Sequence, residues 1–215
     1  VEILSGKVRE GAPIRVIGDY DIDGVNATYI LQEGLMRLGA KVDTDIPDRV
    51  KDGYGLNQML VDRALEDGID TIITCDNGIA AAKEIAYGKA RGLTIVVTDH
   101  HEVPYDLQDM RDSHEQGVSE LEDLDSALNA APHMESVKKI WRLPPADAVV
   151  DPRREDCEYP FKELCGAAVA YKLVEALYKS VPHDVCDVTD LMENGAIATV
   201  GDIMDLVGEN QIIVN

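Results

Sequence analysis

The chain has 215 residues, of which 45% are hydrophobic and 28% charged, so we expect a globular protein rather than a disordered segment. Its 20 basic and 41 acidic residues give a formal net charge of −21, which opposes non-specific binding to phosphate chains and argues against a stand-alone DNA-binding module. We expect a cytoplasmic protein without membrane contact, because no apolar run is long enough to span a membrane and the first residues lack a signal-peptide core.

Runs of β-branched and apolar residues alternate with helix-like stretches along the chain. The predicted strands are 14–18, 42–46, 71–75, 94–98 and 146–150. The predicted helices are about 25–38, 57–67, 79–91, 163–180 and 187–200, and the chain closes on a strand-like run at 211–214. This alternation predicts an α/β fold, a doubly wound and mostly parallel sheet with helices on both faces. In such a sheet, ligands bind at the carboxyl ends of the strands.

Carboxylates and histidines directly follow three of the predicted strands. They lie in the segments 19–24 (DYDIDG), 76–78 (DNG) and 99–101 (DHH). We expect these segments to converge, because the carboxyl ends of parallel strands lie at one edge of a sheet. A divalent cation can offset the desolvation cost of such groups at the ends of buried strands. The three segments therefore predict a metal site.

The first of these segments admits two other interpretations. Asp-x-Asp-x-Asp-Gly opens an EF-hand calcium loop, but the twelfth position holds Ile30 where a bidentate Glu is expected, and the segment follows a strand instead of a helix. Residues 21–24 also resemble the Asp-x-Asp-Gly of haloacid-dehalogenase-type phosphatases, and 201–202 resemble their late Gly-Asp pair. That scheme gives no role to Asp76 or to the two histidines, so we keep it only as an alternative.

The adjacent histidines at 100–101 are hard to place in a core without a function, and successive side chains leaving a strand point in opposite directions. With them, the chain resembles the DHH phosphoesterase superfamily, and within it the catalytic domain of RecJ-type single-stranded-DNA-specific exonucleases. Long blocks in the same order carry the resemblance: 18–24 (GDYDIDG), 47–57 (PDRVKDGYGLN), 74–79 (TCDNGI), 97–104 (VTDHHEVP), 143–152 (LPPADAVVDP), 157–173 (CEYPFKELCGAAVAYKL) and 198–210 (ATVGDIMDLVGEN).

The resemblance implies a phosphodiester hydrolase with two metal ions, Mn²⁺ or Mg²⁺. By position in the motifs, Asp21 and Asp23 would each hold one ion, and Asp76 would bridge both. His100 and Asp202 would complete the coordination. Two such ions together activate a water molecule and neutralise charge on the leaving oxygen.

The resemblance also implies roles for residues around the two ions. Asp19 would be a further ligand or would support the ligands, and Gly78 would leave room behind the bridging carboxylate. His101 would face the scissile phosphate, where it stabilises charge or donates a proton to the leaving group, and Arg49 would contact a phosphate. Tyr54 lies between two glycines, so it is either a base-stacking residue or part of a loop that needs glycine.

On this resemblance, residues 1–215 form the DHH catalytic domain of a longer protein, and the C-terminal DHH-associated domain of the family is absent. The stretch 105–140 departs from the family pattern, with nine acidic and three basic residues and a predicted helix at 119–129. We interpret it as an acidic surface insertion. It is either a passive excursion, a lid, or a binding surface for DNA repair or replication proteins.

The function implied by the resemblance is 5′-to-3′ digestion of single-stranded DNA in repair and recombination. Two alternatives remain open at this point. The chain is alternatively another DHH phosphoesterase, acting on short oligoribonucleotides, cyclic dinucleotides or pyrophosphate. It is otherwise a catalytically silent accessory module, although the intact set of ligand residues argues against that hypothesis.

Overall fold

The computed structural model describes residues 1–48, 55–109, 137–182 and 187–215. The chain divides into two compact units: Val1–Val103 together with Leu143–Asn215 form the larger, and Pro104–Arg142 form the smaller. Within these described ranges, no helix is both long and apolar enough to cross a membrane.

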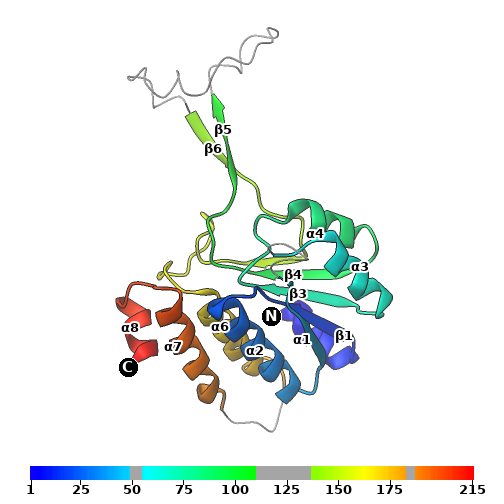
Figure 1. The fold of residues 1–215 in the computed structure, drawn as a ribbon, viewed down its shortest axis with the longest axis horizontal. Coiled ribbons are helices and arrows are strands. Elements are labelled where there is room, and N and C mark those ends of the chain that lie inside the picture. Colours follow the sequence, from blue (N-terminus) through cyan, green and yellow to red (C-terminus); the bar gives the residue numbers. More distant parts are fainter. Residues whose placement is uncertain (49–54, 110–136, 183–186) are drawn as a thin grey trace. The chain divides into compact units, whose positions relative to one another are not determined.

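A parallel sheet with the strand order β2-β1-β3-β4-β7 forms the centre of the larger unit (Figure 1). Its strands are β1 (Pro13–Ile17), β2 (Lys41–Asp45), β3 (Thr71–Cys75), β4 (Thr94–Thr98) and β7 (Ala148–Val150). The register places the last residues of β3 and β4, Cys75 and Thr98, beside each other. The predicted doubly wound α/β fold is confirmed.

Helices pack on both faces of this sheet, as predicted. They are α1 (Glu2–Glu10), α2 (Ile22–Arg37), α3 (Gln58–Glu66), α4 (Ala82–Lys89), α6 (Gly166–Tyr178), α7 (Met192–Gly201) and α8 (Gly208–Val214). Neighbouring residues of a strand point to opposite faces, so Ile72 of β3 packs with Leu60 and Ile85 of α3 and α4, whereas Ile73 packs with α2 and α6. The sheet therefore separates two hydrophobic clusters.

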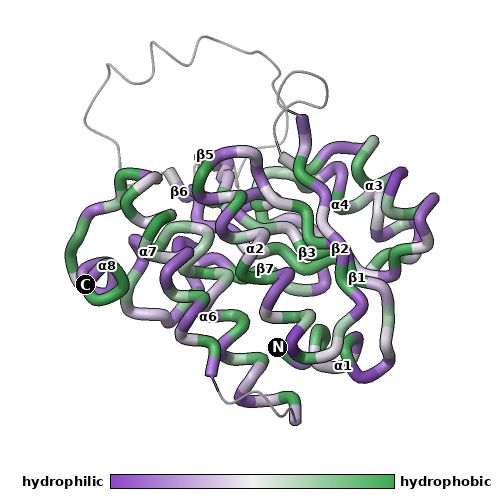
Figure 2. The backbone as a smooth tube through the Cα atoms, turned by 60° about the horizontal axis from the view of Figure 1, so that its bottom comes forward, coloured by the Kyte–Doolittle hydropathy of each residue, from purple (hydrophilic) through white to green (hydrophobic). Residues whose placement is uncertain are grey.

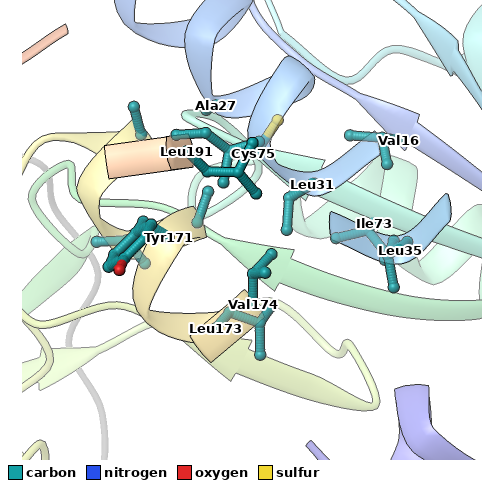
Figure 3. Packing of buried hydrophobic residues seen from close by; sticks show 14 of the residues in the cluster. Val16, Ala27, Leu31, Leu35, Ile73, Cys75, Tyr171, Leu173, Val174 and Leu191 are labelled. Carbon is teal, nitrogen blue, oxygen red and sulfur yellow. The ribbon is translucent and has the colours of Figure 1, made fainter. Parts of the chain in front are cut away.

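The larger cluster lies between the sheet and the helices α2 and α6. In Figure 3, Leu31 and Leu35 of α2 and Val174 of α6 lie near Val16 and Ile73 of the sheet. Hydrophilic and hydrophobic residues alternate along α2 (Figure 2), as expected for a helix with one buried face, whereas most residues of α6 are buried. Each fully buried side chain of this kind contributes about 1.5–3 kcal/mol to stability, so this packing holds both helices on the sheet.

Four elements differ from the predictions or were not predicted. Residues 211–214, which look strand-like in sequence, belong to helix α8, and the first helix of the chain, α1, has no counterpart among the predictions. The smaller unit contains an unpredicted antiparallel pair, β5 (Tyr105–Asp109) and β6 (Val137–Trp141). The helix predicted at 119–129 lies outside the described residues.

Candidate metal centre

The candidate metal centre lies where the order of the strands reverses. After β1, the chain passes through α2 to β2, which lies on one side of β1, whereas β3 pairs with the other side of β1. The connections that leave β1 and β3 therefore run in opposite directions along the sheet. Doubly wound sheets bind their ligands at this switch point.

Asp21 caps the N-terminus of α2 and accepts a hydrogen bond from the Gly24 amide at 2.9 Å. Asp76 directly follows β3 and has a left-handed φ of 58°.

The predicted ligands that lie in the described residues come together in overlapping groups. The ligand atoms of Asp19, Asp21 and Asp76 lie within 4.8 Å of one another, and so do those of Asp23, His100 and Asp202. A further group contains Asp76, His100 and His101. Asp76 and His100 therefore connect the two carboxylate groups.

One imidazole nitrogen faces carboxylates from three different elements. His100 Nε2 lies 3.0 Å from Asp76 Oδ1, 3.5 Å from Asp23 Oδ2 and 3.9 Å from Asp202 Oδ2. His100 follows β4 and Asp76 follows β3. Asp23 lies in the first turn of α2, and Asp202 lies at the end of α7. Oxygen and imidazole ligands in this combination suit Mn²⁺ and Mg²⁺ better than they suit thiophilic metals.

Backbone donors stabilise the negative charge of Asp23, which is almost fully buried. Its Oδ2 and Oδ1 accept hydrogen bonds from the amides of Gly166 and Ala167 at 2.6 and 2.7 Å. Both amides belong to the first turn of α6, where the helix macrodipole also favours an anion. Helix α6 therefore orients Asp23, a contact that joins residues more than 140 positions apart.

Two glycines permit the close approach of backbone around the carboxylates. A Cβ atom on Gly166 would lie 2.7 Å from the Asp76 Cβ, and one on Gly24 would lie 2.5 Å from the Asp19 carbonyl oxygen. The room beside Asp76 therefore comes from Gly166. A Cβ on Gly78, the glycine that we expected to leave room there, would meet the Thr74 hydroxyl at 2.5 Å.

Crowding and burial make these carboxylates costly to ionise in the absence of a cation. Burial, followed by the charges of Asp23 and Asp21, raises the pKa of Asp76 to about 10. Burial is also the largest cause that raises the pKa values of Asp19 and Asp202. A divalent cation would reverse this by favouring the ionised forms, so the donor set fits the predicted metal ions.

Asp99 has a role that the sequence reasoning did not assign. Its Oδ2 accepts a hydrogen bond from the Ile79 amide at 2.9 Å, and its Oδ1 accepts from the His100 amide at 2.8 Å and interacts with His101 Nδ1 at 2.7 Å. Although burial opposes it, the His101 hydrogen bond lowers the pKa of Asp99, and the same bond raises the pKa of His101. Asp99 therefore orients His101 and favours its protonated form. The sequence signal was its position immediately before the two histidines.

His100 and His101 lie in different surroundings, as expected for successive side chains that point in opposite directions. His100 is buried against the carboxylates, whereas the side chain of His101 is 46% exposed. With Nδ1 engaged by Asp99, His101 has its Nε2 left for another partner.

Two predicted substrate contacts, Arg49 and Tyr54, lie outside the described residues. Arg153, which follows the 143–152 block, forms ion pairs with Glu102 and Glu163 at 3.1 Å each. A fourth carboxylate at a strand end, Asp151, is buried after β7, and burial raises its pKa to about 6. It does not belong to the metal-ligand groups found among the described residues.

Comparison with known proteins identifies the family. The model of the DHH family, N-terminal domain, matches residues 13–131. The single-stranded-DNA-specific exonuclease RecJ of Bacillus subtilis (strain 168) is 36% identical over 200 residues, which cover 93% of this chain and 20% of that protein. A crystal structure of exonuclease RecJ bound to manganese matches with a TM-score of 0.71 and 30% identity, covering 99% of this chain and 44% of that one. RecJ from Thermus thermophilus in complex with Mn²⁺ has a TM-score of 0.66, 28% identity and coverages of 99% and 25%.

The chain belongs to the DHH family. The resemblance inferred from the motif blocks is confirmed, and the haloacid-dehalogenase alternative is set aside. The chain spans 20% of the length of the Bacillus subtilis relative.

Proposed function

We propose that this chain is the catalytic DHH domain of a RecJ-type exonuclease, which digests single-stranded DNA from its 5′ end with Mn²⁺ or Mg²⁺. The observation that carries the proposal is the convergence of His100 on three carboxylates, beside the second group formed by Asp19, Asp21 and Asp76. Relatives of the chain are single-stranded-DNA-specific exonucleases, which supports the choice of substrate.

In this proposal, the two carboxylate groups, which Asp76 and His100 connect, would hold two divalent cations. Asp19 and Asp21 would hold one, Asp23, His100 and Asp202 would hold the other, and Asp76 would be shared. Bound there, the cations supply an activated water and neutralise charge on the phosphate.

His101 is the proposed proton donor. Its Nδ1 is fixed by Asp99, which favours the imidazolium form and leaves the proton at Nε2 available. A proton held at that atom can pass to the leaving oxygen of the cleaved bond. Asp99 acts through His101 and is a positioning residue.

The proposal also covers the rest of the chain. Residues 1–215 would be one DHH domain, in which 105–140 form an acidic insertion that offers a surface to repair or replication proteins. Arg49 and Tyr54 would contact phosphate and base. A cytoplasmic location fits a DNA substrate.

The test is digestion of a single-stranded oligodeoxynucleotide labelled at its 5′ end, with and without Mn²⁺, by the full-length protein. Short RNA, pyrophosphate and a cyclic dinucleotide are assayed in parallel. We expect Mn²⁺-dependent release of mononucleotides from DNA. Consumption of another substrate while DNA stays intact would refute the RecJ-type assignment, and inactivity on all four would favour a non-catalytic accessory module.

A further inference from the structure

Ile203 adopts a backbone conformation that its side chain disfavours. Among the described residues, only Asp76 and Ile203 are non-glycine residues with positive φ, at 58° and 57°. Aspartate tolerates this left-handed region, but a β-branched residue there is an outlier that costs roughly 1–2 kcal/mol. Both residues lie at the candidate metal centre, since Ile203 directly follows Asp202.

The local structure around Ile203 is a helix C-terminus at which glycine is the favoured residue. The amides of Ile203 and Met204 donate to the carbonyl oxygens of Val200 and Thr199 at 3.2 and 3.0 Å. These bonds define a Schellman motif whose left-handed position, Ile203, is usually glycine. An isoleucine here makes the end of α7 less stable than a glycine would.

Burial does not compensate for this strain within the described residues. Ile203 is 89% exposed, the highest value among the large exposed hydrophobic residues of the described chain. An exposed apolar side chain on a strained backbone does not stabilise the fold. Residues that depart in this way from the backbone conformations their side chains prefer concentrate at functional sites.

The position of Ile203 points to the substrate as the partner of its side chain. Its Cα lies about 3.8 Å from that of Asp202, whose carboxylate groups with Asp23 and His100. A nucleotide whose phosphate binds at this group brings its sugar and base to the rim that Ile203 occupies. The flat faces of the bases are the largest apolar surfaces that a single strand offers, and contact with them is tolerant of sequence.

We propose that Ile203 contacts the base of a nucleotide adjacent to the scissile phosphate and thereby positions the strand. This inference rests on the proposed function. It assigns Ile203 to substrate binding, a role that neither the motif reasoning nor the metal site gives it.

The test compares Ile203→Gly and Ile203→Asn with the wild type in the full-length protein. Both replacements tolerate the left-handed backbone and remove the apolar contact. We expect an unchanged or higher Tm, and a KM for single-stranded DNA raised roughly tenfold, the order of one partly buried apolar side chain. On an oligonucleotide with abasic residues at its 5′ end, the wild type should lose the same factor and the variants should lose little more. Ile212→Ala, at a residue that is 73% exposed on α8, is the matched control and should change neither KM nor Tm.

Three results would overturn the inference. One is an unchanged KM in both Ile203 variants, and another is an equal loss on ordinary and abasic DNA, which would place the contact on the sugar or phosphate. The third is a lower Tm in both variants, which would show that another part of the protein covers Ile203. Failure of the proposed function is distinguishable, because the wild type itself would then leave the DNA intact.

Discussion

Two buried aspartates at the ends of neighbouring strands differ in what surrounds them. Asp76 follows β3 and Asp99 follows β4, and they are only 2% and 1% exposed. Asp99 accepts hydrogen bonds from the Ile79 and His100 amides and pairs with His101, and its pKa is lowered. Asp76 lies beside other carboxylates as well as His100 Nε2, which is 3.0 Å from its Oδ1, and burial together with the charges of those carboxylates raises its pKa to about 10.

The contrast shows which aspartate belongs to the fold and which requires a ligand. The protein itself satisfies Asp99, so Asp99 can hold His101 in place whether or not a cation is bound. Asp76 is ionised at neutral pH only when an added positive charge offsets the neighbouring carboxylates. Substitutions at the two positions should therefore have different effects on cation binding, catalysis and stability.

The largest effect is expected from Asp76→Asn. The amide cannot supply a shared anionic ligand, so Mn²⁺-dependent DNA cleavage should fall at least about 10³-fold, several kcal/mol of transition-state stabilisation. Calorimetric titration should show weakened Mn²⁺ binding. The matched control is Asp156→Asn, which removes an exposed partner of Arg154 and should leave cleavage and binding unchanged. An active Asp76→Asn enzyme would refute the shared-ligand role.

His101→Ala should reduce kcat by roughly 10²–10⁴-fold, the usual contribution of a positioned acid or base. Because we assign His101 to proton donation, Mn²⁺ binding should survive in this variant. His100→Ala is the comparison, since its Nε2 faces three carboxylates and its loss should weaken binding. Equal loss of Mn²⁺ affinity in the two variants would mean that both histidines are ligands.

Asp99→Asn should have a smaller effect, about 10–100-fold on kcat, because it acts through the orientation of His101. The hydrogen bond from His101 raises the pKa of that imidazole, so its weakening should lower the pKa. The alkaline limb of the pH–rate profile should then move to lower pH. Mn²⁺ affinity should change much less than in Asp76→Asn. A reduced rate with an unmoved alkaline limb would contradict the role of Asp99.

Much of the fold was predictable from sequence because the strands carry a strong local signal. The runs at 71–75 and 94–98 match β3 and β4 at both ends. Helix α8 was not predictable, because the apolar run at 211–214 has no strand partner and its start depends on tertiary contacts, including bonds from the Asn210 side chain to the Glu163 and Asp205 carbonyls. The β5–β6 pair was missed because its strands are rich in charge and amide groups.

The composition of the candidate site followed from sequence, but its internal geometry did not. The convergence of Asp76 with His100 is expected for residues at the ends of adjacent parallel strands. The amides that hold Asp23 come from α6, and no local pattern shows which distant helix will begin there. The close approach of Gly166 to Asp76 is likewise a contact made only in the folded chain.

The last expected effect concerns the stability of the metal-free protein and not its catalysis. The folded pKa of Asp76 is raised to about 10, above its ordinary value of 3.8, so the folded state binds a proton that the unfolded chain releases between these values. Stability should therefore fall as pH rises through this window, by up to about 1.4 kcal/mol per pH unit for one group. Asp99 has a lowered pKa, so its contribution is constant there and is lost only in more acidic solution.

Urea unfolding of the metal-free wild type, Asp76→Asn and Asp99→Asn between pH 5 and 9 separates these contributions. The general repulsion within this acidic chain affects all three proteins alike. In the metal-free proteins, we expect the free energy of unfolding of the wild type and of Asp99→Asn to fall with rising pH more steeply than that of Asp76→Asn. Saturating Mn²⁺ should remove this steeper fall in the wild type and in Asp99→Asn, the two proteins that retain Asp76. If the free energy of unfolding depended on pH equally in all three proteins, the carboxylates around Asp76 would ionise without a cation. Asp76 and Asp99 would then differ only in their hydrogen bonds.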